Sequence, residues 1–382
     1  MSWRTAIAYS FLQAVSTTSW NVGLAFDAKI SVRLDAACTN DWSDGAMPAA
    51  IPLIRGFALL PTLHWLASEG VSVERALAGV DLSLSPITYP FRPIPLVHAA
   101  ALLRNAGREH GPDLPCRIVS KTSSLEIAML GKVALGARTP GEALARIVAA
   151  LPYYCSHEQV SFERKAGQYV VREFFAHRFD PETQHTLLQY AAAMIDRILS
   201  MAGAPPPRFA KIEIPPHPLH KVEHLRRWFS DRVIETKSRG ITVLIDDWIM
   251  ERAFGRIARD RLNPRAFNSG ASLRGGETFS DSVKAFLNLM VENDEALNMK
   301  RVVAAAGMSE RTFQRQLKEE GASFSGLLAD VRRSETLKRL KERNLTIAAI
   351  AKDLGYSDHA TFTRAFRRWT GVPPSRFRAT AS

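Results

Sequence analysis

One pattern near the C-terminus constrains the fold of this chain more than any other feature. At about residues 299–320 an apolar-faced segment ends at Gly307-Met308-Ser309, and a second segment follows with Phe313 and Leu317 four residues apart. Apolar residues at this spacing predict one buried face of a helix, and glycine permits a tight turn between two short helices. The region is therefore predicted to form a helix-turn-helix unit. Its second helix leaves these side chains facing outward: Arg311, Gln314, Arg315 and Lys318.

The same pattern recurs at about residues 346–370. Gly355-Tyr356-Ser357 marks the turn, and the helix after it has Phe362, Phe366 and Trp369 at core spacing. Residues 324–343 are predicted to form a long helix that joins the two units. Such a domain could place two recognition helices in successive major-groove segments about 34 Å apart. The outward side chains of the second unit are His359, Thr361, Thr363, Arg364, Arg367 and Arg368.

The charge distribution agrees with a DNA-binding role for this region. The 382 residues carry a net charge of +12, and residues 301–382 carry 16 Lys or Arg against 8 Asp or Glu, which is +8 of that total. Arginine can form a bidentate pair with guanine, glutamine suits adenine, and a threonine methyl suits thymine. Ordinary solvated helix faces would account for a single arginine, but they account poorly for a doubled and one-sided pattern.

Four segments closely resemble the AraC/XylS family of bacterial transcription regulators: Gly307–Leu317, Val331–Arg333, Ile350–Asp358 and Thr361–Pro374. The resemblance covers about residues 278–379 and implies seven helices that hold two helix-turn-helix units. By position it implies base readout by Arg311, Gln314 and Arg315 in the first unit and by His359, Thr361 and Arg364 in the second. Phosphate contacts are expected from Ser309, Thr312, Lys318, Arg332, Arg333, Thr363 and Arg368.

The preceding part of the chain is predicted to be an α+β domain over residues 47–260. Thr139-Pro140-Gly141-Glu142 is typical of a capped helix start, and Gln159–Arg164 and Gln168–Phe175 flank a short turn as in a β-hairpin. The fold class is therefore an α+β N-terminal domain followed by an all-α C-terminal domain. Further helices are expected at residues 53–67, 93–105, 181–201 and 219–229, and strands at 208–214 and within 233–245.

The segments outside these domains are predicted from composition. Residues 1–46 are expected to be a disordered extension, with Met47 as an alternative translation start. Residues 261–276 are rich in Asn, Ser, Gly and Arg and are expected to be a flexible linker, so the DNA-binding domain would occupy residues 277–382.

The first domain also resembles a family, on shorter motifs. Ile127–Gly131, Thr139–Leu144, and the stretch from Trp228-Phe229 through Val243–Asp246 are similar to the arabinose-binding-type N-terminal domain of one branch of these regulators. The resemblance spans about residues 50–250 and implies effector sensing, dimerisation or both. Aromatic and histidine side chains on and before the hairpin are candidates for lining a ligand pocket: Tyr153, Tyr154, His157, Tyr169 and Phe174.

Two other groups of residues are candidates for chemical sites. His217, His220 and His224 have a spacing compatible with metal ligands, but no thiol or carboxylate completes the set, so no metal is expected. Pro115-Cys116-Arg117 is faintly similar to the methyl-accepting cysteine of alkyl-transfer proteins that share the DNA-binding module. With only Cys38 and Cys155 besides, such a site lacks its further metal-binding cysteines. We expect no cofactor and no enzymatic activity.

The sequence thus predicts a sequence-specific DNA-binding regulator that responds to an effector and activates transcription, with repression left open. Its expected partners are double-stranded DNA, an unknown small-molecule effector, RNA polymerase and a second copy of the chain in a homodimer. Three scattered cysteines fit a cytoplasmic location, and no run of about 18 apolar residues predicts a membrane helix. The alternatives are a DNA-repair alkyl-transfer protein and a non-specific DNA-binding protein.

Overall fold

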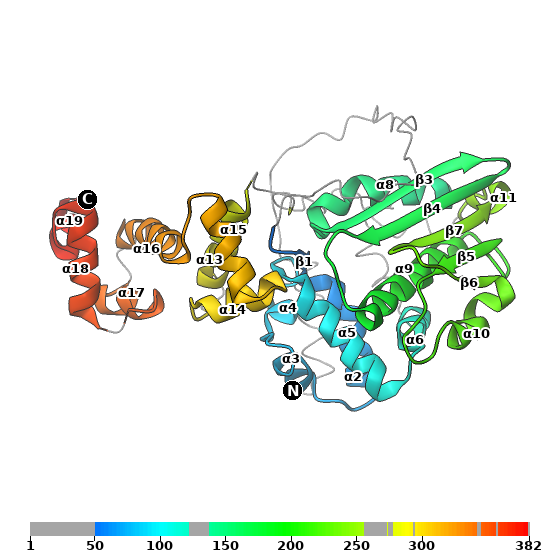
Figure 1. Cartoon of the computed structure of the whole chain (residues 1–382), viewed down its shortest axis with the longest axis horizontal. Coiled ribbons are helices and arrows are strands. Elements are labelled where there is room, and N and C mark those ends of the chain that lie inside the picture. The colour runs from blue at the N-terminus through cyan, green and yellow to red at the C-terminus, as the bar shows by residue number, and fades with distance from the viewer. Residues whose placement is uncertain are drawn as a thin grey trace. The chain divides into compact units, whose positions relative to one another are not determined.

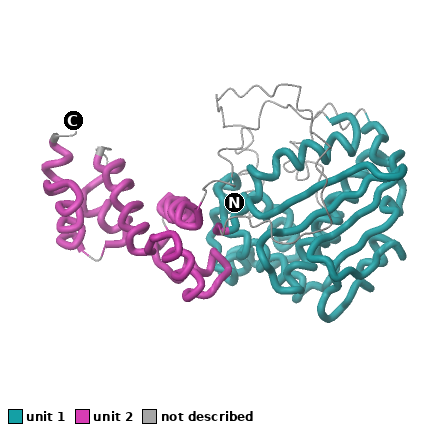
Figure 2. The backbone as a smooth tube through the Cα atoms, turned by 45° about the horizontal axis from the view of Figure 1, so that its top comes forward, with its two compact units in different colours: residues 1–43, 52–274 teal, residues 44–51, 275–382 magenta. Residues whose placement is uncertain are grey.

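The computed structural model describes residues 50–121, 137–255, 273, 278–292, 295–341, 345–356 and 358–380. These residues form two compact units (Figure 2). Unit 1 comprises the described residues between 52 and 274, and unit 2 comprises residues 50–51 and those from 278 onward. The expected extension at 1–46 with Met47, and the expected linker 261–276 apart from Leu273, lie outside the described residues. So do the Ile127–Gly131 motif, Cys38 and Ser357.

Unit 1 is built on a five-stranded sheet with the strand order β3-β4-β7-β5-β6. All neighbours are antiparallel except β5 and β6, which are parallel. The predicted hairpin is confirmed, because β3 and β4 pair from Glu158 opposite Phe175 to Lys165 opposite Gln168. Its two turn residues, Ala166 and Gly167, have φ of 50° and 80°, as tight hairpin turns require. The strands are β3 (Glu158–Lys165), β4 (Gln168–Phe175), β5 (Lys211–Ile214), β6 (Val233–Glu235) and β7 (Ile241–Asp246).

Two long helices cover the sheet and share its core (Figure 1). The predicted helix at residues 181–201 is confirmed as α9 (Pro181–Met201), where Asp180 caps the start by accepting a hydrogen bond from the Thr183 amide. α8 (Pro140–Tyr154) begins at the predicted cap, and Thr139 Oγ1 accepts from the Glu142 amide at 3.3 Å. The Glu142 carboxylate accepts a hydrogen bond of 2.9 Å from the amide of Arg138, one residue before the cap, and not from that of Thr139 as in a capping box.

The first elements of unit 1 form a second, mainly helical core beside the first. They are β1 (Leu53–Arg55), η1 (Gly56–Leu59), α2 (Leu60–Ser68), α3 (Val73–Ala78), α4 (Ser85–Thr88), β2 (Pro93–Pro95), α5 (Leu96–His110) and α6 (Leu114–Lys121). The core of the sheet also includes buried residues of η2 (Glu223–Leu225), α10 (Arg226–Phe229) and α11 (Asp247–Met250), and η3 (Ser230–Arg232) follows α10. No helix of the described residues is both long and apolar enough to cross a membrane.

Four predicted elements of unit 1 differ from the observed ones. The first residues of the helices expected at 53–67 and 93–105 are instead strands β1 and β2, which pair with Leu53 opposite Pro95. Prolines on both sides of Ile94 favour an extended backbone, which explains why β2 forms at the start of the helix expected at 93–105. The helix expected at 219–229 is reduced to η2 and α10, because Lys221 has a φ of 52° and bridges back to His217. The strand expected at 208–214 is limited to β5.

The described residues of unit 2 contain seven helices and no strand, and helices are observed in the three regions where they were predicted, at about residues 299–320, 324–343 and 346–370. α19 was not among the elements expected from residue spacing. In Figure 1, α16 lies between the group α13–α15 and the group α17–α19. The helices are α13 (Phe279–Glu292), α14 (Met299–Ala306), α15 (Glu310–Glu319), α16 (Phe324–Lys341), α17 (Ile347–Asp353), α18 (His359–Thr370) and α19 (Pro374–Thr380).

Four histidines of unit 1 contact one another between α9 and the segment before α10. The Nε2 atoms of His185 and His224 are 3.0 Å apart, and the ring centres of His217 and His220 are 4.8 Å apart. Burial, together with repulsion from the neighbouring imidazoles, lowers the pKa of His185 to about 3 and that of His224 to about 4. These rings are therefore neutral in the folded protein at neutral pH. No group of three or more candidate ligands in the described part of the chain is placed to hold a metal ion.

The lowered pKa values predict that unit 1 loses stability on acidification. An unfolded histidine has a pKa of about 6.5, so below that pH the unfolded chain binds protons that the folded chain excludes. The contribution of the neutral histidines to the free energy of unfolding is fully present above about pH 6.5 and is lost as the pH falls toward about 4. The loss is about 1.4 kcal/mol per pH unit for each proton that the unfolded chain binds and the folded chain does not. Urea unfolding at several pH values should show that His224→Asn reduces this slope, whereas the exposed His359→Asn leaves it unchanged. Equal slopes in all three proteins would contradict the assignment.

Gly240 is required by a close approach of the β6–β7 connection to β4. A Cβ at this position would lie 2.5 Å from the Glu173 carbonyl oxygen and 3.0 Å from Phe174 Cβ. We expect Gly240→Ala to lower the free energy of unfolding by about 1–3 kcal/mol. In the matched control Gly107→Ala, on α5, a Cβ meets nothing within 4 Å, and a helical alanine should raise stability by about 0.5–1 kcal/mol. Chemical denaturation measures both, and an equal effect of the two changes would refute the steric argument.

Candidate DNA-binding surface and ligand cavity

The predicted base-reading residues of α15 lie on its exposed side. Phe313 and Leu317 are buried, at 0% and 1% exposure, which fixes the orientation of the helix. Arg311, Gln314 and Arg315 are consequently exposed. Arg315 pairs with Glu319 at 3.7 Å, but both side chains are about two-thirds exposed, so this ion pair contributes little and leaves the guanidinium available.

The predicted residues of α18 form a connected polar group at the start of that helix. Asp358 caps α18 by accepting from the Thr361 amide at 2.7 Å, and its carboxylate also accepts from the Thr361 hydroxyl. The same hydroxyl accepts a hydrogen bond of 3.0 Å from Arg364 Nη2. His359 and Arg364 are exposed, and Thr361 is half-buried. This arrangement holds the Arg364 guanidinium at the start of α18.

The residues expected to contact phosphate fall into distinct environments. Lys318, Arg333 and Arg368 are exposed cations. The hydroxyls of Ser309 and Thr312 are hydrogen-bonded to each other at 2.9 Å at the N-terminus of α15. The Thr363 hydroxyl is buried and has no hydrogen-bond partner among the described residues. Three cations and two hydroxyls of the expected set thus lie at the surface or at a helix start.

Arg332 has a structural environment that sequence reasoning missed. Its Nε and Nη2 donate to the carbonyls of Leu354 and Gly355 at 2.8 and 3.0 Å. Its guanidinium carbon lies 4.8 Å from the centre of the Tyr356 ring, and burial lowers its pKa. Arg332 therefore ties α16 to the turn between α17 and α18. The partners are more than 20 residues away, so no local pattern could have indicated this contact.

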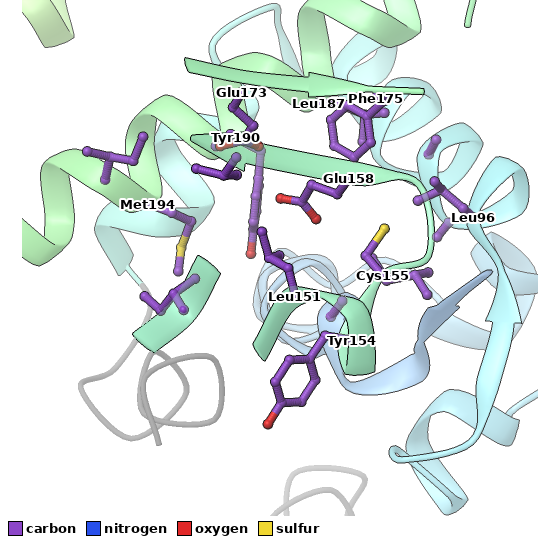
Figure 3. Close-up of a pocket in the computed structure, with 18 of the residues that line it drawn as sticks. Leu96, Leu151, Tyr154, Cys155, Glu158, Glu173, Phe175, Leu187, Tyr190 and Met194 are labelled. Atoms are coloured by element: carbon purple, nitrogen blue, oxygen red, sulfur yellow. The ribbon is translucent and has the colours of Figure 1, made fainter. Parts of the chain in front are cut away.

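Unit 1 contains a cavity of about 180 Å³ between the sheet and its covering helices (Figure 3). Of the five residues predicted to line a pocket, only Tyr154 belongs to its lining. Tyr153 is 40% exposed, and His157 is buried with its Nδ1 2.7 Å from Ser156 Oγ. The lining residues are Ile54, Phe57, Ala58, Leu59, Thr62, Leu96, Ala99, Ala100, Leu103, Leu144, Ile147, Val148, Ala150, Leu151, Tyr154, Cys155, Glu158, Val160, Glu173, Phe175, Leu187, Tyr190, Ala191, Met194, Ile195 and Ile198.

The other two predicted pocket residues lie on the strands but outside this lining. Tyr169 is near the hairpin turn, and Phe174 alternates with Glu173 and Phe175, so it faces away from them. Because side chains alternate along β4, Glu173 and Phe175 line the cavity and Phe174 does not. The identity of the buried face could not be determined from aromatic content alone.

Two carboxyl groups line this otherwise apolar cavity. Glu158 and Glu173 project from the same face of β3 and β4, where Val160 is directly opposite Glu173. Glu173 is 4% exposed, and its Oε1 has no hydrogen-bond partner among the described residues. Burial and the neighbouring Glu158 raise the pKa of Glu173 well above its usual range. In the sequence, one feature could have indicated this buried carboxyl: Glu173 lies between Val171 and Phe175, two apolar residues on the inward face of β4.

The environment of Cys116 is unsuited to alkyl transfer. The thiol is 2% exposed and receives a hydrogen bond of 3.4 Å from Gln189 Nε2. Burial raises its pKa to about 12, so the nucleophilic thiolate is not populated at neutral pH.

Two family models match different parts of the chain. A family model described as a helix-turn-helix domain matches residues 302–380, and one described as the arabinose-binding domain of AraC transcription regulator, N-terminal, matches residues 70–244. The solved structure of the transcriptional regulator CdpR from Pseudomonas aeruginosa aligns with 85% of this chain and 98% of its own, at 19% identity and a TM-score of 0.38.

Several curated relatives match a minor part of the chain. An uncharacterized HTH-type transcriptional regulator of Mycobacterium bovis is 40% identical over 76 residues, which are 20% of this chain and 22% of the relative. The HTH-type transcriptional regulator VqsM of Pseudomonas aeruginosa is 28% identical over 30% of this chain and 38% of its own length. The chain thus spans less than two-fifths of these relatives.

A shorter relative is matched over most of its length. The multiple antibiotic resistance protein MarA of Salmonella typhimurium is 30% identical over 101 residues, which are 26% of this chain and 80% of MarA. Together with the two family models, one for each part of the chain, this match shows that the protein belongs to the AraC family of helix-turn-helix, DNA-binding transcription regulators.

Proposed function

We propose that this regulator reads two adjacent major-groove segments with α15 and α18 and that unit 1 controls this binding in response to a small-molecule effector. The observation that carries the proposal is the duplicated arrangement in unit 2. The helix pairs α14/α15 and α17/α18 both present a polar, partly basic second helix, and both pairs belong to the compact unit through which α16 runs.

The turns of the two pairs support their interpretation as helix-turn-helix units. Gly307 and Gly355 adopt φ of 64° and 73°, a conformation that strongly favours glycine. Ser309 and Asp358 then cap the second helices by accepting from the Thr312 and Thr361 amides. The two pairs therefore share a glycine with positive φ in the turn and a side-chain cap at the start of the second helix, as expected for two helix-turn-helix units.

We assign base readout to the residues that the family resemblance indicated: Arg311, Gln314, Arg315, His359, Thr361 and Arg364. Lys318, Arg333 and Arg368 supply phosphate contacts, and Ser309 and Thr312 do so from the N-terminus of α15, where amide groups favour an anion. Arg332 acts chiefly by holding the second pair on α16, because two of its N–H groups are already bonded to backbone carbonyls.

The effector acts through a coupling free energy between the cavity of unit 1 and the DNA surface of unit 2. Effector binding changes which arrangements of the two units reach DNA. By family resemblance the outcome is activation, with RNA polymerase as a partner and a homodimer as the assembled form. The buried, protonated Cys116 gives no support to the alkyl-transfer alternative.

The assignment predicts different effects for base-reading and phosphate-contacting arginines. Arg315→Ala and Arg364→Ala should each weaken binding to the cognate site by about 1–3 kcal/mol and relax base choice at one position. The matched control Arg333→Ala should weaken binding to all sequences alike and flatten the dependence of log K on log salt by about one unit. Fluorescence anisotropy on a site selected from a random library, and on scrambled DNA, measures these effects. Equal losses on both DNAs for Arg315→Ala and Arg364→Ala would favour non-specific DNA binding.

A further inference from the structure

We propose that the cavity of unit 1 binds a monocationic amine with a short apolar tail, whose ammonium group lies between Glu158 and Glu173. The inference rests on the proposed effector-sensing role and specifies the chemical class of the effector. In Figure 3 the Glu158 carboxyl points into the middle of the lining side chains, among them Leu151, Tyr190 and Cys155.

The apolar lining of the cavity favours a ligand with an apolar tail. Aliphatic and aromatic side chains from α5, α8 and α9 make up most of the wall, and none of the described lining residues carries a basic group. A sugar presents hydroxyls around its whole ring, and each of them would need a polar partner to offset desolvation. The few polar side chains of this wall cannot supply that number, so a sugar such as arabinose fits the cavity poorly.

The carboxyl groups of Glu158 and Glu173 favour a ligand with a positively charged end. Glu173 is nearly fully buried, forms no ion pair with a basic side chain of the described residues, and has an unpartnered Oε1. Two ionised carboxylates in such a site repel each other, and burial with this repulsion raises the pKa of Glu173. A positively charged ligand relieves this repulsion, and an ammonium group donates the hydrogen bond that Oε1 lacks.

The size of the cavity limits the tail. A buried apolar cavity of roughly 150 Å³ holds a benzene molecule. The cavity here measures about 180 Å³. The ligand is therefore expected to have roughly seven to nine non-hydrogen atoms, as in a hexylamine or a phenylethylamine.

The test is calorimetric titration of the full-length protein at neutral pH with n-hexylamine, which is protonated there because its pKa resembles that of lysine. We expect saturable binding of one equivalent, and at least tenfold weaker binding of 1-hexanol, hexanoate and L-arabinose. Glu173→Gln should weaken hexylamine binding at least tenfold, and Glu158→Gln provides the same test if the first variant folds poorly. The matched control Glu163→Gln, an exposed residue of β3 paired with Arg172, should bind like the parent protein.

Three outcomes would overturn the proposal: no binding of hexylamine, equally tight binding of 1-hexanol, or unchanged affinity in the folded Glu173→Gln and Glu158→Gln variants. Sequence-selective DNA binding is measured on the same preparation without amine. If DNA is bound selectively and hexylamine is not bound, the ligand class is wrong and the proposed DNA readout stands. If hexylamine is bound and no DNA is selected, the ligand class is supported and the proposed DNA readout fails.

Discussion

The burial of one apolar stripe on each of two short helices determines the rest of unit 2. Phe313 on α15, and Phe362 and Phe366 on α18, are completely buried. Because side chains three or four residues apart share a helix face, this burial leaves the polar residues between them on the outer surface. The DNA-reading proposal depends on that partition, since an apolar stripe displaced by one residue would turn the arginines toward the core.

Polar contacts then fix these helices relative to one another. The Glu320 carboxylate at the end of α15 accepts hydrogen bonds from the amides of Phe279 and Ser280 at the start of α13, at 2.7 and 2.8 Å. On the other side of α16, Arg332 binds the backbone of the second turn, and Arg339 pairs with Asp353 on α17 at 3.1 Å. In unit 1 the alternation of β4 has a comparable consequence, because it places Glu173 among apolar residues and gives the cavity its acidic end.

Local patterns predicted most of the fold, whereas long-range contacts had to be observed. Helix spacing and capping residues were sufficient for α9 and the helices from α14 to α18, and the short turn at Ala166-Gly167 was sufficient for the hairpin. The cavity was not predictable in this way, because its wall is assembled from segments far apart in the sequence and only Tyr154 was anticipated. The same holds for Arg332, whose sequence context indicates an exposed cation and whose partners come from another helix pair.

The most direct test of the central claim is capture of sheared genomic DNA by the full-length protein at near-physiological salt, followed by sequencing. Two recognition helices in adjacent major-groove segments predict enrichment of a few sites that contain two short motifs about 10–10.5 base pairs apart. Recovery of genomic DNA without sequence preference, or enrichment of a single short motif with no second one at that spacing, would contradict the claim.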